Sequence, residues 1–412
     1  MFHPQNRFLE ASRTTPLGTT AKFPSAFDLQ SQTGQEKRVC ENAKNRVEID
    51  PETGEILGPV RAFDSMVAKC DRFILQSVVR RLMGSSRTAK CLRFRQPGHD
   101  VEVFRSLEYR SASYGGLQTC GSVWACPVCA AKIAERRRVE IQTAMAAHVA
   151  VGGNFALLTL TIPHQVVDVL PDLLQKLASA KARFLGHRAV RRVLGEMGFV
   201  GQISALEVTH GRKSGRNNGW HPHPHILLFT RYGGGIDPHW TSALYVLWSA
   251  ACQSVGLGLP SRAHGIRLDD GRKAAAYVSK WGLEDEITKG HTKKSAHGET
   301  PFDFLRAIVA DSGDKQAARL FVEFARAFKG KQQLLWSRGL KELYLVEETS
   351  DEELAGKQDE LASLLGTIGE HEWREVLRVE GRGIVLMLAV AGGWDAVRTY
   401  LDGLLDSSQI GG

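Results

Sequence analysis

Three histidines occupy alternate positions of the stretch Trp220–Phe229, which reads WHPHPHILLF. Because alternate residues of a β-strand face the same way, His221, His223 and His225 are predicted to share one face. Neutral imidazole is a common ligand for divalent cations, so three of them on a rigid strand form part of a coordination sphere. A lone histidine would more simply be a satisfied surface residue. Three in register favour a metal site.

A carboxylate is the ligand that this interpretation still needs. The strand predicted just upstream, VGQISALEVTHG, carries Glu207 among apolar residues, where an unpaired acid would be unfavourable to bury. Two imidazoles and one carboxylate with open positions suit catalysis on a phosphate better than a closed structural site does. The spacing predicts a site made by His223, His225 and Glu207, with His221 as an additional ligand or as support behind the ligands.

A second reactive group is the tyrosine of the segment AAAYVSKW. Residues three and four apart are neighbours on a helix, so Lys273, Tyr277 and Lys280 are predicted to share a face. For this segment alone, a packed tyrosine between solvated lysines is the simpler interpretation. In a chain that also carries the histidine strand, a nucleophilic tyrosine is favoured. A phenol has a pKa of about 10, so nearby ammonium groups and a metal-polarised phosphate are needed to favour attack by the phenolate.

The cysteines suggest a second kind of metal site. The chain has seven, and the segment CGSVWACPVC contains three of them. In a reducing compartment such clustering indicates metal or redox use rather than a disulfide framework. Tetrahedral zinc needs four ligands, and inert buried cysteines are the alternative. The predicted structural zinc ligands are Cys91, Cys120, Cys126 and Cys129.

A basic helix follows the cysteines directly. Its AERRR segment places Arg136, Arg137 and Arg138 beside the predicted zinc site, in a chain with a formal net charge of +8. Such a cluster is either a solvated helix face or a contact for the phosphates of a nucleic acid. No apolar run approaches the ~20 residues of a membrane span, and the first residues lack the apolar centre of a secretory signal. We therefore expect a cytoplasmic protein with no membrane partner.

The elements around these residues predict an α/β (α+β) fold. The order of strands and helices between NFALLTLTIP and the AAAYVSKW helix describes a largely antiparallel central sheet flanked by helices. Four regions are expected: a weakly ordered segment over 1–60; a helix, short strands, the cysteine-rich zinc segment and the basic helix over 61–150; the central domain over 151–299; and a helical accessory domain over 300–412.

HPHPHILLF resembles the His-hydrophobic-His motif of HUH endonucleases, specifically of plasmid rolling-circle replication initiators. In that family the last two histidines, here His223 and His225, bind the metal together with an acid of the preceding strand, here Glu207. The LLTLT strand is similar to the first family motif, and Tyr277 and Lys280 match the nucleophile and lysine of the third. The match spans roughly residues 120–285, and QLLWSRGLK resembles a downstream part of such initiators.

The resemblance implies a HUH-type sheet and a metal-dependent tyrosine DNA endonuclease and strand transferase. Such an enzyme nicks one strand at a plasmid origin through a covalent 5′-phosphotyrosine, leaves a 3′-hydroxyl primer and later rejoins the strand. Mn²⁺ or Mg²⁺ is the expected catalytic ion and Zn²⁺ the structural one. The expected partners are single-stranded or hairpin origin DNA, host helicase and host polymerase.

Two alternatives remain open at this point. A HUH-type transposase or mobilisation relaxase would use the same chemistry, whereas a non-catalytic zinc-dependent DNA-binding regulator would use only the cysteines and the charge. The chain also departs from the family pattern. Some initiators carry a glutamate four residues before the tyrosine, where this chain has Lys273. The group that activates water for termination is therefore undefined, with Glu284 and Glu286 as candidates.

Overall fold

The computed structural model describes residues 60–107, 110–213, 217–231, 237–270, 298–357 and 361–409. Nearly all of the N-terminal segment predicted to be weakly ordered lies outside these residues. The segment that carries Lys273, Tyr277 and Lys280 also lies outside them, together with Glu284 and Glu286.

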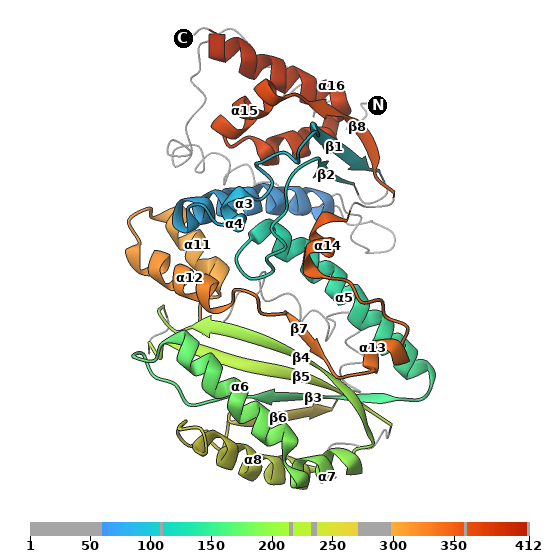
Figure 1. Cartoon of the computed structure of the whole chain (residues 1–412), viewed down its shortest axis with the longest axis vertical. Coiled ribbons are helices and arrows are strands. Elements are labelled where there is room, and N and C mark those ends of the chain that lie inside the picture. The colour runs from blue at the N-terminus through green and yellow to red at the C-terminus, as the bar shows by residue number, and fades with distance from the viewer. Residues whose placement is uncertain are drawn as a thin grey trace, which may run out of the picture.

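A five-stranded antiparallel sheet forms the lower half of the molecule in the view of Figure 1. Its strand order is β6-β3-β5-β4-β7, so the histidine strand β5 is the middle strand. The strands are β3 (Asn154–Leu160), β4 (Phe199–His210), β5 (Trp220–Thr230), β6 (Ile266–Asp270) and β7 (Leu334–Trp336). The predicted α/β fold with an antiparallel central sheet flanked by helices is confirmed.

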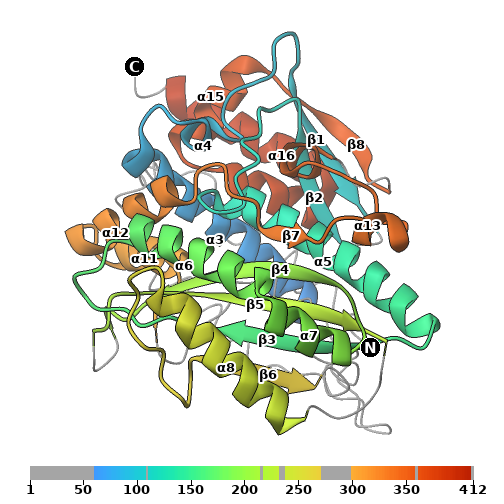
Figure 2. The same cartoon turned by 60° about the horizontal axis from the view of Figure 1, so that its bottom comes forward.

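Three helices cover one face of this sheet in both Figure 1 and Figure 2. They are α6 (Leu170–Gly186), α7 (Arg188–Glu196) and α8 (Pro238–Gln253). Helix α6 begins around Pro171 and buries Leu173, Leu177 and Phe184, whose helical spacing forms one apolar stripe. This stripe packs in one core with Leu158 of β3 and Ile226 of β5. These two residues are paired across neighbouring strands, so their side chains point to the same side of the sheet. Helices α11 (Pro301–Ala310) and α12 (Lys315–Ala327) extend that core.

The opposite face of the sheet is covered over part of its length. Helix α5 (Pro127–Ala150) connects the cysteine segment to β3, and the short helix α13 (Leu340–Leu343) follows β7. Ile141 and Met145 of α5 pack against Leu227 and Phe229 of β5. Because side chains alternate along a strand, the histidines of β5 lie on the same face as Leu227 and Phe229. They precede these apolar residues and lie towards the start of the strand.

A smaller three-stranded sheet has the order β2-β1-β8 and joins segments far apart in the chain. Its strands are β1 (Val101–Ser106), β2 (Ser111–Gly115) and β8 (Ser363–Ile368). It packs with α3 (Val60–Met83), α15 (Glu370–Arg378) and α16 (Arg382–Gln409), while α4 (Arg87–Lys90) and α14 (Asp351–Gly356) lie nearer the cysteines. The C-terminal region predicted to be helical thus also contributes the short strands β7 and β8. These strands pair with β4 and β1, which are distant in sequence. The predicted domain boundaries stay a prediction.

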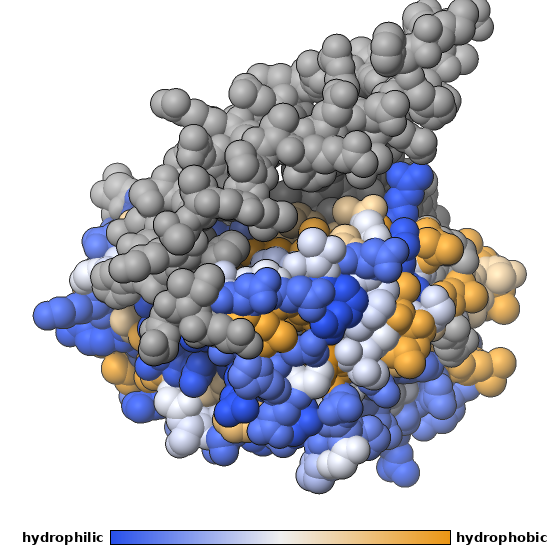
Figure 3. Space-filling view, turned by 90° about the horizontal axis from the view of Figure 1, so that it is seen from above, coloured by the Kyte–Doolittle hydropathy of each residue, from blue (hydrophilic) through white to orange (hydrophobic). Residues whose placement is uncertain are grey.

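Among the described residues, α16 is the one helix long and apolar enough to span a membrane by length and composition. Its backbone leaves helical geometry at Gly393 (φ 70°, ψ −155°). Val385 and Leu401 are buried in a core with α3 and the small sheet, and Arg398 pairs with Glu372 and Asp402. Figure 3 shows the molecule from above the view of Figure 1. Where the described surface is visible there, hydrophobic and hydrophilic side chains are interspersed. One side of α16 thus packs against α3 and the small sheet.

Candidate metal centres

Glu207, His223 and His225 come together on the middle of the large sheet. In the pairing of β4 with β5, Glu207 lies directly opposite His223. The Glu207 Oε2 atom lies 3.5 Å from His223 Nε2 and 3.2 Å from His225 Nε2. The three side chains are 16%, 13% and 9% exposed, respectively. One ligand atom of each residue lies within 4.8 Å of the others, so this group can hold a metal ion while remaining reachable from solvent.

Neighbouring groups orient the two imidazoles. His223 Nδ1 lies 3.3 Å from the backbone carbonyl of His221, which can only accept a hydrogen bond. His223 Nδ1 therefore carries the proton, which leaves the Nε2 lone pair facing Glu207. His225 Nδ1 lies 3.1 Å from the hydroxyl of Thr159 on β3, the residue paired with His225 across the sheet. Both rings thus direct Nε2 towards Glu207.

His221 occupies a position behind this group. Its ring stacks on His223 at 4.7 Å between centroids and faces His164 at 4.8 Å. Burial and, to a smaller extent, the neighbouring imidazoles of His223 and His164 together lower the pKa of His221 to about 3. His221 therefore stays neutral at physiological pH, and its nitrogens are not among the ligand atoms that converge on Glu207. His164 was not predicted from the sequence, because it lies after β3 and outside the alternating pattern.

The four cysteines predicted to bind zinc converge into one buried cluster. Sulfur–sulfur distances are 3.4 Å for Cys91–Cys129, 3.7 Å for Cys120–Cys129 and 3.8 Å for Cys91–Cys126. Tetrahedral zinc with sulfurs at about 2.3 Å would set them about 3.8 Å apart. The donor set and its dimensions therefore fit a closed tetrahedral site.

The surroundings of the cysteines decide how many of the four thiols can ionise. The pKa of Cys91 is raised by hydrogen bonds with the other three thiols and by burial, because a second thiolate would meet like charge in a water-excluded site. Cys126 caps the N-terminus of α5, a position that favours thiolate. Gln76, which was not predicted, donates to the carbonyl of Cys91 at 2.9 Å and to the Cys126 sulfur at 3.5 Å. A bound cation would allow all four sulfurs to ionise.

The arginines after the cysteines make contacts within the protein. Arg136 donates to the carbonyl of Lys357, and Arg138 pairs with Glu135 at 2.5 Å. Arg137 is 11% exposed and pairs with Glu140 and Asp351. Their contact with phosphates stays a prediction.

A buried ion-pair group lies where the chain re-enters the described structure after residue 297. Arg212, at the end of β4, donates to both oxygens of Glu299 and to those of Asp314 at 2.7–2.9 Å. The backbones of His210 and Glu299 also exchange two hydrogen bonds. Upstream, β6 ends at Asp270 two strands away from β5. Asp270 and Glu299, which flank the segment that contains Tyr277, thus both pair with strands of the sheet that carries the histidines.

The comparisons with known proteins agree with this arrangement. Residues 116–233 match the family model described as "Replication protein". This range contains Cys120, Cys126 and Cys129, β3, and the Glu207, His223 and His225 group, and it ends before Tyr277. The segment that contains the Glu207, His223 and His225 group and three of the four clustered cysteines is thus similar to replication proteins.

Two relatives were found among characterised proteins. "Protein rep" of Streptomyces lividans is 29% identical over 301 residues, which cover 55% of this chain and 64% of that protein. "Neomycin resistance protein" of Streptomyces cyanogenus is 30% identical over 137 residues, which cover 27% of this chain and 30% of that protein. The chain thus spans less than two thirds of either relative, and no solved structure matches it. The resemblance to plasmid replication initiators predicted from the motifs is confirmed.

Proposed function

We propose that the protein initiates plasmid rolling-circle replication by nicking one DNA strand at the origin. Tyr277 becomes linked to the 5′ phosphate, a free 3′-hydroxyl primes synthesis, and the strand is later rejoined. The observation that carries the proposal is the convergence of Glu207, His223 and His225 on the middle of a sheet within the replication-protein segment. A DNA-binding regulator without catalysis would have no use for this open ligand group.

In the proposed reaction each residue has a distinct task. Glu207, His223 and His225 hold a divalent cation, Mn²⁺ or Mg²⁺, which when bound draws charge from the scissile phosphate. The Tyr277 oxygen attacks phosphorus and the bond from phosphorus to the 3′ oxygen breaks, so the number of phosphodiester bonds is conserved. The tyrosine loses its proton, the departing 3′ oxygen gains one, and Lys280 stabilises the charge that develops in the transition state. Rejoining is the reverse displacement and needs no ATP.

The other groups serve binding and architecture in this proposal. The four cysteines hold structural Zn²⁺, and Arg136, Arg137, Arg138 and Lys273 contact phosphates of single-stranded or hairpin origin DNA. Host helicase and polymerase then extend the primer in the cytoplasm. A HUH-type transposase or relaxase would use the same chemistry on other DNA, so the substrate decides between these functions.

The test is incubation of the purified protein with supercoiled DNA of its own replicon, in the presence of Mn²⁺ or Mg²⁺. We expect a nick at one position of one strand, which disappears with a chelator and returns when the ion is added back. Specific binding without any nick under all ion conditions would contradict the proposal and support a regulator. Nicking confined to transposon ends or to a transfer origin would assign the chemistry to a transposase or a relaxase.

A further inference from the structure

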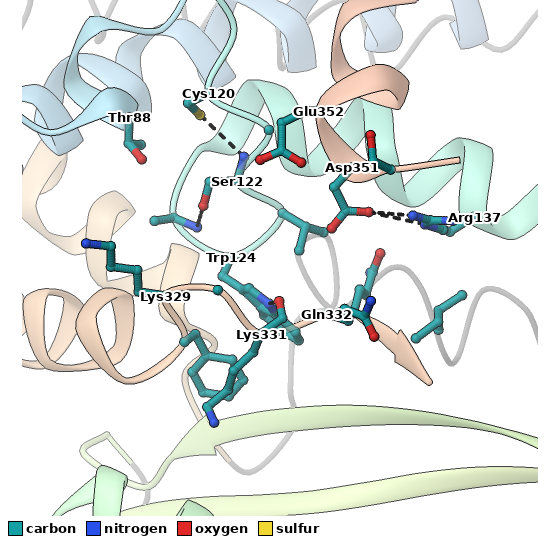
Figure 4. Close-up of a pocket in the computed structure, with 18 of the residues that line it drawn as sticks. Thr88, Cys120, Ser122, Trp124, Arg137, Lys329, Lys331, Gln332, Asp351 and Glu352 are labelled. Atoms are coloured by element: carbon teal, nitrogen blue, oxygen red, sulfur yellow. Dashed lines mark hydrogen bonds and ion pairs between the residues drawn. The ribbon is translucent and has the colours of Figure 1, made fainter. Parts of the chain in front are cut away.

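A cavity of about 1110 Å³ lies between the cysteine segment, α14 and the connection from α12 to β7. Figure 4 shows Trp124 from the first segment, Glu352 from the second, and Lys329 and Lys331 from the third around it. None of its lining residues belongs to the Glu207, His223 and His225 group. The cavity is therefore separate from the proposed reaction centre.

The acids on the α14 side of the cavity have partners within the protein. Asp351 pairs with Arg137 at 2.7 Å, as the dashed lines of Figure 4 show. Glu352 lies 3.8 Å from Arg87, and Glu353 accepts hydrogen bonds from Ser350 at the start of the helix. Asp351 and Glu352 thus face cations of the protein, and Glu353 is held in the cap of α14.

The opposite side carries uncompensated positive charge. Arg326, Lys329 and Lys331 are exposed, and within the part of the chain that the structure describes none of them pairs with an acid. We call these three residues the basic wall. Gly330, between the lysines, has a φ of 75°, a conformation that favours glycine and allows a tight turn.

Trp124 holds this turn in place. Its indole Nε1 donates to the carbonyl of Lys331 at 2.7 Å, and its ring contacts Phe328 at 4.5 Å between centroids. The cysteine segment therefore positions the basic wall, and the partly exposed indole adds an aromatic group to the cavity. Basic side chains beside aromatic ones are the usual composition of single-strand nucleic-acid sites.

The register of β7 puts the basic wall close to the reaction centre. Leu334 pairs with Ala205 of β4 in antiparallel sense, so residues before Leu334 run alongside those after Ala205. Ala205 lies two residues before Glu207, and Lys331 lies three residues before Leu334 on the segment that leads into β7. The basic wall therefore lies on the segment that enters the sheet beside β4, the strand that carries Glu207.

We propose that the basic wall binds the phosphodiester backbone of the single strand that continues from the scissile phosphate. This inference rests on the proposed function for the identity of the DNA. The cavity volume is typical of a small-ligand pocket and admits a few nucleotides of one strand. A duplex does not fit, because its major groove alone is about 12 Å wide. The cysteine segment is thereby part of the single-strand path and not only a structural support.

The test compares two double variants, Lys329→Ala with Lys331→Ala and, as the matched control, Lys176→Ala with Lys315→Ala. Lys176 and Lys315 are exposed lysines on α6 and α12 that do not line the cavity. The probes are a labelled oligothymidylate and a labelled duplex of unrelated sequence. For the basic-wall variant we expect weaker strand binding and a salt slope lower by about 1.4, since each lost single-strand phosphate contact removes about 0.7. The control should match the wild type, and melting temperatures should stay unchanged because all four lysines are exposed.

Equal affinity and slope in both variants would overturn the inference, and so would a loss confined to the duplex. The proposed function fails separately. If the wild type never nicks but the basic-wall variant binds the strand more weakly, the nickase proposal is wrong and the binding site stands. If nicking is metal-dependent and strand binding is unaffected by the lysine changes, the reverse holds.

Discussion

The two ligand groups of this protein differ in their donors and in their access to solvent. Four thiols from two segments close around a buried point, with spacings that fit tetrahedral zinc. One carboxylate and two imidazoles lie on adjacent strands and remain partly exposed. Soft thiolates in a closed shell favour a permanent ion, and harder donors with open positions favour an exchangeable one.

The two ligand groups also differ in how the fold holds their residues in place. The cysteines lie outside the strands: Cys91 ends α4, Cys126 and Cys129 lie at the start of α5, and Cys120 lies in the segment before it. Their positions therefore depend on a link that joins the two segments. The ligands of the open group lie on strands paired over many residues, so the sheet holds them whether or not an ion is bound. We therefore expect metal removal to affect folding at one site and chemistry at the other.

The largest effect should come from the open group. His225→Ala removes one ligand, and we expect nicking to fall on the order of 10³-fold because charge at the phosphate is no longer stabilised. Stability should change little, since the sheet does not depend on the ion. His239→Ala, an exposed histidine at the start of α8, is the matched control and should nick normally. The readouts are nicking rate and thermal melting, and a fully active His225→Ala protein would contradict the assignment.

The closed group should respond in the opposite way. Cys126→Ser is expected to abolish zinc retention and to destabilise the protein by more than about 3 kcal/mol, because the ligands are held together by the ion. Cys252→Ala, which removes a buried thiol outside the cluster, should keep bound zinc. Metal analysis and denaturant unfolding measure the two effects. Unchanged stability of Cys126→Ser would mean that the cysteines are inert core residues.

Ion pairs, rather than a metal, should fix the ends of the strands near the open group. Arg212→Met leaves Glu299 and Asp314 without their buried partner, which should destabilise the fold by about 3–5 kcal/mol. Arg306→Met breaks an exposed pair with Asp303 and should lose at most about 1 kcal/mol. Equal losses in the two variants would show that burial of the Arg212 group contributes nothing.

The same ion pairs predict a dependence on pH. The pKa of Glu299 is lowered by hydrogen bonds from Arg212 and Lys213, which outweigh its burial, and the pKa of Asp314 is lowered by hydrogen bonds from the Ala317 backbone and Arg212. A depressed folded-state pKa stabilises the fold above the unfolded value of about 4 and loses that effect as pH falls through the folded value. The stability gap between wild type and Arg212→Met should therefore narrow below about pH 4. A constant gap would contradict the role of charge.

The smallest effect should be on metal affinity through Thr159. Thr159→Val keeps the shape but removes the hydroxyl that contacts His225, and loss of such a contact typically weakens metal binding by 10–100-fold. Thr399→Val on α16 is the control and should bind Mn²⁺ as the wild type does. Titration with Mn²⁺ measures the affinities. An unchanged affinity would mean that strand pairing alone orients His225.

Patterns local in sequence predicted much of the site. Alternation along one strand placed His223 and His225 on one face, and Glu207 was predicted because an acid in an apolar strand needs a partner. Thr159 could have been found too, since it lies in the predicted strand LLTLT. The pairing of β8 with β1, and Arg212 with Glu299, could not be predicted, because only tertiary contacts join these distant segments.

The most direct test of the central claim is to identify the protein–DNA linkage. After reaction with origin DNA and denaturation, we expect a fragment to remain attached through its 5′ phosphate to a peptide that contains Tyr277. Tyr277→Phe should bind DNA but form neither nick nor adduct, whereas Tyr245→Phe, which alters a tyrosine bonded to the Pro260 carbonyl, should behave as wild type. A nick without an adduct, or normal nicking by Tyr277→Phe, would contradict the account.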